Sequence, residues 1–513
     1  MLSRQTTINM IAQIISLVVT FGISFFLTPF IVNNIGIASY GYVGLANNFI
    51  SYAQIITVAL NSMAGRFITV SLHKNDIIQA KKYFTSVFIS NVLMTLVLTI
   101  PIVLILLNLN FLINIPVNLI GDVTVLVGLF FLNFLFSIIG SVFGVAVFAQ
   151  NRLDLASVRD ITSKLLRVIV LISAFSLFEP KLAYIAISTI TATVAVLIIN
   201  IYYTNKLLPN IKINKKFYDF SSIKEILSSG VWNSFTQLSS ILSKGLSLLV
   251  SNLFIGPNAM GVLSVSQTIP NIILTLFATL SKVFAPELTI SFAKNDSNSM
   301  RAQLVTSIKF LGFFATIPLV ILYVYGDIFF SLWIPNQNSD LLHSLSILMC
   351  IGFTFALPME GLWNIFTAVN KVKQTSVFLF INAILTILLI LIGLFIFNDS
   401  SIRLYVIAGA EALISLIRSL TFLPLYGAFC LDLKLTTFYP AIVKNGLSLL
   451  IISFISMVIK STFLIDNWFS FLMVCIVTAI ISIFINGIFV LGKPERRYLF
   501  NMIIKTLKRG HKK

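Results

Sequence analysis

The sequence predicts an all-α integral membrane protein with about 14 transmembrane helices, arranged as two parallel-repeat six-helix bundles plus two C-terminal helices. Three observations predict this class. Apolar residues make up 58% of the 513 residues and charged residues only 10%, which is too few charges to cover a soluble chain of this length. The apolar residues form continuous stretches of about 20 residues, long enough to cross a bilayer as helices. Short motifs in the first half also recur, in the same order, in the second half.

The apolar stretches define the expected transmembrane helices. They lie at residues 9–31, 42–64, 84–107, 124–148, 158–178, 181–204, 227–254, 261–285, 304–327, 342–367, 375–397, 402–426, 439–460 and 467–491. Their continuity argues against a β-barrel, whose strands read as short alternating segments. The first stretch is too long for a signal peptide and lacks a small-residue cleavage site, so we expect it to be the first transmembrane helix.

Four motifs are repeated at offsets of 217 to 220 residues. They pair Ile35-Gly36 with Ile255-Gly256, Lys74-Asn75-Asp76 with Lys294-Asn295-Asp296, Asn151-Arg152 with Asn370-Lys371, and Pro101 with Pro318. Both halves have the same predicted topology, so they form a parallel repeat related by an axis along the membrane normal. Such a duplication points to a transporter with its substrate site between the repeats. The two Lys-Asn-Asp copies fall in loops, where we expect headgroup-level gates or anchors.

The predicted domains follow from this repeat. They are an N-terminal six-helix bundle at residues 1–205, a basic linker at 206–226, a C-terminal six-helix bundle at 227–430, two extra helices at 431–492 and a basic tail at 493–513. No loop is long enough to form a soluble domain. The external loops are especially short, which argues against an enzyme that holds an external glycan.

The positive charges predict the orientation of the chain. The side that carries the N-terminus receives 27 of the 35 Lys and Arg residues, with Lys164 counted among its loops. The opposite side receives only Lys181, Arg403 and Lys460. The positive-inside rule therefore places both termini in the cytoplasm. The net charge of +18 is then explained by membrane orientation, with the basic tail on anionic lipid headgroups and no nucleic-acid partner.

Motifs for enzymatic chemistry are missing from the sequence. It contains no P-loop, no paired-His metal motif and no G-x-S-x-G elbow. The three cysteines, Cys350, Cys430 and Cys475, lack zinc spacing and fall in or beside apolar stretches. We therefore predict a protein that is not an enzyme and has no metal or cofactor.

The candidate binding residues are charges inside the predicted spans, because such charges are costly unless they face a bundle interior or water. Lys244 and Arg418 lie two or more turns from either end of their spans, and Lys282 lies in the inner third of its span. Arg66 and Arg167 are taken to lie near cytoplasmic ends, where they can snorkel to the headgroups. A cationic cavity suits an anionic substrate group such as phosphate, which Arg holds with a fork and Lys as a point charge.

Other readings of these residues stay open. Arg418 can instead form a structural ion pair with Glu411 or Glu360, and these two carboxylates are candidates for coupling to H⁺ or Na⁺. Trp232, Asn233 and Gln237 belong to a polar stretch of the seventh span. Polar residues can simply join helices, but their density beside Lys244 favours a hydrophilic cavity wall that suits a sugar.

The chain resembles the polysaccharide transporter family, the repeat-unit flippases of the multidrug/oligosaccharidyl-lipid/polysaccharide (MOP) superfamily. The resemblance is carried by Thr28-Pro29-Phe30, Tyr40-Gly41, Asn61 to Phe67, Ser229 to Asn233 and Asn370-Lys371. It implies two six-helix bundles, often with two extra helices, in the bacterial cytoplasmic membrane. It also implies transport of an undecaprenyl-diphosphate-linked oligosaccharide, for O-antigen, capsule or exopolysaccharide, to the outer leaflet. A central cationic cavity would hold the diphosphate and glycan, and polysaccharide polymerase machinery is an expected partner.

Two other classes of function remain as alternatives. A multidrug and toxin extrusion antiporter of the same superfamily would export organic cations, and it would be expected to bury acidic residues in a bundle. The N-terminal half has almost no carboxylate inside its spans, which favours an anionic substrate. A membrane polysaccharide polymerase or ligase is disfavoured by the short external loops.

Overall fold

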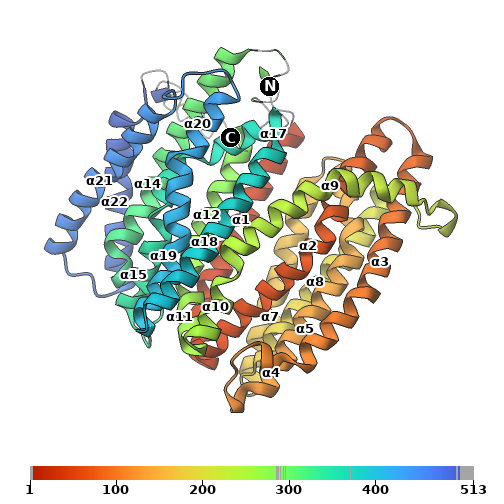
Figure 1. Cartoon of the computed structure of the whole chain (residues 1–513), viewed down its shortest axis with the longest axis horizontal. Helices are drawn as coiled ribbons and strands as arrows, with labels where there is room; N and C mark the ends of the chain where they lie inside the picture. The colour runs from red at the N-terminus through yellow and green to blue at the C-terminus, as the bar shows by residue number, and fades with distance from the viewer. Residues whose placement is uncertain are drawn as a thin grey trace, which may run out of the picture. The chain divides into compact units, whose positions relative to one another are not determined.

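The computed structural model describes the whole chain except residues 1–3, 285–287, 289–290, 293, 295, 370, 493–494 and 497–513. Within the described residues all regular secondary structure is helical (Figure 1). The long helices are α1 (Arg4–Ile35), α2 (Ile37–His73), α3 (Ile77–Leu107), α5 (Ile120–Gly140), α7 (Leu153–Leu177), α8 (Leu182–Leu207), α9 (Phe220–Ser240), α14 (Ser297–Trp333), α18 (Val372–Ile396), α19 (Ser400–Leu420), α21 (Tyr439–Thr462) and α22 (Trp468–Phe489). Shorter helices are α4 (Leu109–Leu112), α6 (Val145–Ala149), α10 (Ser247–Phe254), α11 (Pro257–Ser266), α12 (Thr268–Ser281), α15 (Ser339–Cys350), α16 (Phe353–Ala356), α17 (Trp363–Ala368) and α20 (Phe422–Phe429).

Within the described residues, each apolar stretch predicted to span the membrane is largely helical. In the described part of the chain, 11 helices are long and apolar enough to cross a bilayer. The other three predicted stretches are more polar or interrupted: α7, the α9–α10 segment, and the α15–α17 segment. The predicted fold class, a multi-pass all-helical membrane protein, is therefore confirmed.

The aspartates of the repeated Lys-Asn-Asp motif have the same local structure in both copies. Asp76 caps α3 and Asp296 caps α14, and each carboxylate accepts a hydrogen bond from the backbone N–H three residues later at 2.9 Å. The backbone N–H groups of Asp76 and Asp296 also each donate to the carbonyl five residues earlier at 3.0 Å. Gly36 and Gly256 both have positive φ, at 83° and 135°, a conformation that favours glycine. The repeated motifs therefore mark the turns and caps of a duplicated unit.

The chain divides into two compact units. Unit 1 comprises Met1–Val265 and Ser376–Ile387, and unit 2 comprises Ser266–Thr375 and Leu388–Lys513. The predicted linker at 206–226 lies within unit 1, because Leu208, Ile211 and Ile223 are buried in the same apolar cluster as Leu60 and Phe84. The α9 and α10 helices, predicted for the C-terminal bundle, also belong to unit 1. The boundaries of the six-helix bundles stay a prediction.

In unit 1, α2 and α9 pack at very close range. A Cβ atom added at Gly230 on α9 would lie 1.8 Å from the carbonyl oxygen of Ala59 on α2, so only glycine fits there. One turn along the same contact, Asn233 donates to the hydroxyl of Ser62 at 3.1 Å. Small residues with interhelical hydrogen bonds are the usual way for membrane helices to associate, and here they form an α2–α9 seam.

In unit 2, the two extra helices pack on α14 through buried polar groups. The Asn486 side chain is fully buried and donates to the carbonyl oxygen of Phe313 at 3.0 Å and to the hydroxyl of Thr316 at 2.5 Å. The Tyr325 hydroxyl donates to the carbonyl oxygen of Ser456 at 3.0 Å. Because a broken hydrogen bond is costly in an apolar medium, these groups fix where α21 and α22 dock.

Ion pairs flank this polar contact. Lys460 on α21 lies 2.6 Å from Asp327 on α14, and Lys309 on α14 lies 2.5 Å from Glu495, which follows α22. Asp327 and Lys309 are 18 residues apart, about 27 Å along α14 at 1.5 Å per residue. The extra helices are therefore tied to α14 near both ends of its membrane segment.

Candidate functional site

Lys244 occupies an unusual turn of its transmembrane segment. The chain from Ile241 to Gly245 forms a π-helical turn between α9 and α10, a feature that is rare and often found at functional sites. Two side chains of α2 bind the carbonyl oxygen of Gly245: Asn48 donates at 2.9 Å and the Tyr52 hydroxyl donates at 2.6 Å. The partly exposed Lys244 is thus held at a fixed point of unit 1.

The predicted polar residues of α9 lie along the α2–α9 seam. Asn233 and Gln237 share one face of α9, since they are four residues apart, and both are partly exposed. Asn233 contacts Ser62, and Arg66 lies one turn beyond Ser62 on α2 with an exposed side chain. Asn233 is 11 residues from Lys244, roughly 16 Å along the helix, so these residues form an extended strip. Trp232 packs edge-on against Phe235 at 6.1 Å between ring centroids.

The remaining predicted residues lie in unit 2. Arg418 on α19 places its guanidinium carbon 6.0 Å from the ring centroid of Trp363, and its Nη2 donates to Ser415 at 3.2 Å. Its charge also interacts with the carboxylates of Glu411 and Glu360. This cluster fits the structural ion pair that the sequence left open, and it also fits an ion-coupling site.

Lys282 lies at the edge of the same region of unit 2. It follows α12 in a 3₁₀ turn, and its side chain is exposed. The Asn364 amide on α17 donates to the carbonyl oxygen of the preceding residue, Ser281, at 2.9 Å. The structure therefore brings the backbone at Lys282 next to α17, which begins at Trp363.

Two cations of α7 correct the sequence interpretation. Lys164 was assigned to a cytoplasmic loop and Arg167 to a cytoplasmic helix end, but both lie well inside α7. They are 11 and 14 residues from the first residue of the helix, Leu153, about 16 Å and 21 Å along its axis. Arg167 thus lies near the middle of α7, not at its end. The sequence carried a signal for this placement, because three cations inside one apolar stretch are unusual.

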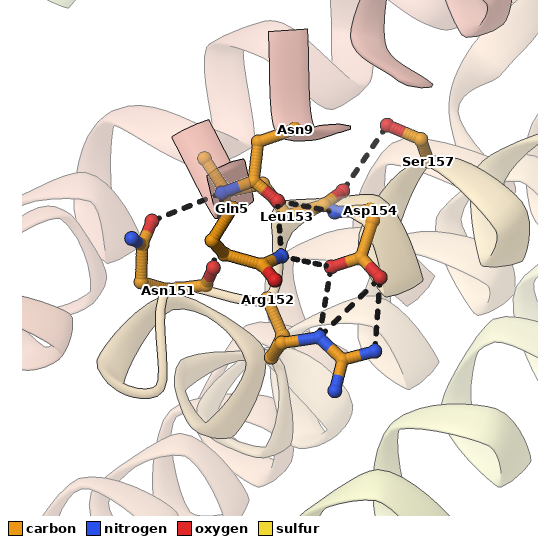
Figure 2. A network of polar contacts seen from close by, with 7 residues as sticks. All are labelled: Gln5, Asn9, Asn151, Arg152, Leu153, Asp154 and Ser157. Carbon is orange, nitrogen blue, oxygen red and sulfur yellow. Dashed lines mark hydrogen bonds and ion pairs between the residues drawn. The ribbon is translucent and has the colours of Figure 1, made fainter. Parts of the chain in front are cut away.

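The cytoplasmic end of α7, as the sequence orients the chain, is fixed to α1 by a polar network (Figure 2). Asn9 of α1 accepts a hydrogen bond from the backbone N–H of Asp154 at 3.1 Å and donates to the carbonyl oxygen of Asn151 at 2.9 Å. Arg152 binds the Asp154 carboxylate through two nitrogens, at 3.0 Å and 2.9 Å. This contact holds the pKa of Asp154 below its usual range. Asn151 has a positive φ of 52°, which asparagine tolerates.

Comparison with known proteins now assigns the family. A model of the family described as polysaccharide biosynthesis protein matches residues 6–290, more than half of the chain. The chain belongs to this family. The resemblance noted from the sequence is thereby confirmed.

A curated relative is similar to this chain over almost its full length. The uncharacterized membrane protein EpsK of Bacillus subtilis (strain 168) is 26% identical over 509 residues, which are 98% of each chain.

Solved structures confirm the fold. The lipid II flippase MurJ in an inward closed conformation matches with a TM-score of 0.64 at 15% identity, over 93% of this chain and 97% of MurJ. An inward-facing multidrug resistance MATE family transporter of the MOP superfamily matches with a TM-score of 0.62 at 13% identity, over 80% of this chain and 94% of that one. This member of the polysaccharide biosynthesis family therefore has the fold of MOP superfamily transporters. The roles of Lys244, Arg418 and the other candidate residues stay predictions.

Proposed function

We propose that this protein is a flippase that moves undecaprenyl-diphosphate-linked oligosaccharide repeat units from the cytoplasmic to the outer leaflet for cell-surface polysaccharide biosynthesis. The family match and the MurJ-like fold support a transporter of this class over an enzyme. Moving a diphosphate and sugars through hydrocarbon without a protein is prohibitively costly, and a cavity that opens to each side in turn lowers this cost.

The observation that carries the proposal is Lys244 in its π-helical turn. A cation in a membrane segment is costly unless it serves a polar cavity, and here Asn48 and Tyr52 hold the backbone beside it. The neighbouring face of α9 offers the amides of Asn233 and Gln237, groups that bind sugar hydroxyls. A phosphate on Lys244 with a glycan along α9 fits this strip.

The remaining expectations form part of the same proposal. The protein lies in a bacterial cytoplasmic membrane with both termini in the cytoplasm, as the distribution of Lys and Arg supports. Its basic tail, which falls almost entirely outside the described residues, contacts anionic lipids, and polysaccharide polymerase machinery is its expected protein partner.

We also propose that the acidic pair of unit 2, Glu360 and Glu411, couples transport to an ion gradient. Glu360 and Glu411 both interact electrostatically with Arg418, and carboxylates inside a span are candidates for coupling to H⁺ or Na⁺. We expect Glu411→Gln and Glu360→Gln to weaken the dependence of transport on an ion gradient in proteoliposomes. Glu179→Gln, in the connection before α8, is the matched control.

A cation antiporter of the multidrug type is the second candidate, since a MATE transporter shares the fold and unit 2 contains this acidic pair. The cations Lys244, Lys164 and Arg167 in the described part of unit 1 disfavour a cationic substrate, because like charges repel it. Drug-resistance and cation-efflux assays on the expressed protein separate the two functions, and we expect both to be negative.

The flippase proposal is tested by substitution of the two central cations. We expect Lys244→Ala and Arg418→Ala to cause accumulation of lipid-linked sugar on the cytoplasmic leaflet, with Lys244→Arg and Arg418→Lys less severe. Lys181→Ala, in an external connection, should transport normally. Normal flipping by both alanine variants at normal protein levels contradicts these assignments.

A further inference from the structure

Three cations lie on α7, and they differ in whether the protein supplies a partner. Arg159 donates to the Asp160 carboxylate at 2.7 Å and to the Asn200 side chain at 2.7 Å. Lys164 donates to the Thr20 hydroxyl of α1. Arg167 forms no hydrogen bond or ion pair with any residue that the structure describes, and its Nε atom is buried without a partner. Arg167 is therefore the uncompensated charge of this helix.

Lys164 and Arg167 face the same direction. They are three residues apart on one helix, a spacing that puts their Cβ atoms about 5–6 Å from each other. Thr20 marks the α1 side of this face, and Arg167 interacts electrostatically with Tyr40 of α2. Tyr40 in turn lies 3.3 Å from the hydroxyl of Thr28 on α1. Two cations and several neutral hydroxyl groups from three helices thus surround one place in unit 1.

Among the described residues, no free carboxylate neutralises the charges of Lys164 and Arg167. Asp160 is the acidic group that interacts with Lys164, but its oxygen is already held by Arg159 at 2.7 Å. Arg167 is only partly exposed as a residue, and its Nε atom lies buried inside the bundle without a hydrogen-bond partner. A buried guanidinium without a partner is costly, and a bound anion would compensate its charge.

We propose that Lys164 and Arg167, with Thr20 and Tyr40, form a binding site for a phosphate-type oxyanion within the N-terminal bundle. Arg167 supplies a planar fork for two oxygens and Lys164 a point charge for a neighbouring oxygen. A diphosphate matches two cations at this spacing better than a single phosphate does. Phospholipid headgroups lie at the membrane surface, whereas this site lies near mid-span, so the diphosphate of a transported lipid is the favoured ligand. That identification rests on the proposed function.

Direct binding tests the site without transport. The full-length protein in phosphatidylcholine nanodiscs is titrated with farnesyl diphosphate, inorganic pyrophosphate and farnesol. We expect farnesyl diphosphate to bind, farnesol to fail, and Arg167→Gln to weaken the binding about tenfold or more. Lys164→Gln should weaken it less, Arg167→Lys should restore part of it, and Arg159→Gln should change it less than about twofold. Unchanged affinity in Arg167→Gln overturns the proposal.

Two further measurements identify the source of the anion and test whether Arg167 has only a structural role. Tighter binding of farnesyl diphosphate than of pyrophosphate supports the lipid diphosphate, while competition by phosphatidylglycerol nanodiscs overturns that choice in favour of a lipid headgroup. Without ligand, Arg167→Gln should melt at the same or a higher temperature than the native protein, because an uncompensated charge is removed. A clear drop in melting temperature shows that Arg167 holds the bundle together, and it overturns the site. Binding without flipping refutes the proposed function alone.

Discussion

Asn9 on α1 caps α7, because its Oδ1 accepts a hydrogen bond from the backbone N–H of Asp154 at 3.1 Å (Figure 2). Thr20 follows Asn9 by 11 residues on α1, and Lys164 follows Asp154 by ten residues on α7. Both helices rise by about 1.5 Å per residue, and Lys164 donates to Thr20. The contact at Asn9 therefore sets the register of two parallel helices and, through it, the position of the two cations deeper in the span.

Asn9→Ala should destabilise unit 1. The Asn9 side chain is 3% exposed, so its loss leaves the first turn of α7 and the Asn151 carbonyl unpaired. We expect a loss of about 1–2 kcal/mol in the free energy of unfolding, measured by thermal unfolding in nanodiscs, with faster hydrogen exchange at Asp154. Gln13→Ala removes an exposed amide from the same helix and should be neutral. Equal stability of the two variants would show that Asn9 does not act as a cap.

The Arg152–Asp154 contact should make stability depend on pH. Because the pKa of folded Asp154 is lowered by Arg152, its contribution is present above the ordinary carboxyl pKa and is lost as the pH falls through the folded pKa. The melting temperature of the native protein should therefore decrease below about pH 4. Asp154→Asn should melt lower at neutral pH and show a smaller decrease on acidification. Parallel curves for the two proteins would contradict the assignment.

Gly230→Ala tests the close approach of α9 to α2. The added Cβ would lie 1.8 Å from the Ala59 carbonyl oxygen, so the backbones must separate. We expect a cost of about 1–3 kcal/mol, a lower melting temperature and reduced transport. Gly22→Ala is the matched control, since a Cβ at Gly22 meets nothing within 4 Å. If both variants behave alike, the seam tolerates separation.

Composition and the length of the apolar stretches were sufficient to predict the helical fold class. These signals are sums over many residues, and local errors cancel in them. The duplication was equally accessible, because turns and caps need particular residues: Asp76 and Asp296 accept the same hydrogen bond in the same conformation. The structure also assigns these two residues a physical role, as helix caps, where the sequence predicted gates or anchors.

The site was less accessible because it depends on which side chains meet. Sequence spacing indicated that Lys244 is buried in a span, but not that its helix has a π-turn whose carbonyl binds Asn48 and Tyr52. Lys164 was read as a loop residue because basic residues usually mark helix ends. Arg418 and Glu411 were correctly placed on one helix, while the stacking of Arg418 on Trp363 arises from a contact between distant segments.

The two donors to the Gly245 carbonyl should matter for transport. Tyr52→Phe removes one hydrogen bond and leaves that of Asn48, so it should be mild. The double variant Tyr52→Phe/Asn48→Ala leaves the carbonyl unpaired, at a cost of about 1–3 kcal/mol, and releases the turn that holds Lys244. We expect flipping to fall more than the amount of folded protein. Native flipping by the double variant would show that the π-turn is held by other contacts.

The contacts of α14 with α21 and α22 should differ in strength. Lys460 and Asp327 have side chains that are 30% and 32% exposed, so a double-mutant cycle should give a coupling of only about 1 kcal/mol. Asn486 is fully buried. Asn486→Leu removes the amide that donates to the Phe313 carbonyl and the Thr316 hydroxyl and the oxygen that accepts from the Ser448 hydroxyl. We expect Asn486→Leu to cost about 2–4 kcal/mol, since each unpaired buried group is penalised. Unfolding of the variants in detergent measures both values. A cost for Asn486→Leu no larger than that for Lys460→Ala would mean that apolar packing, rather than the buried amide, holds the two extra helices on α14.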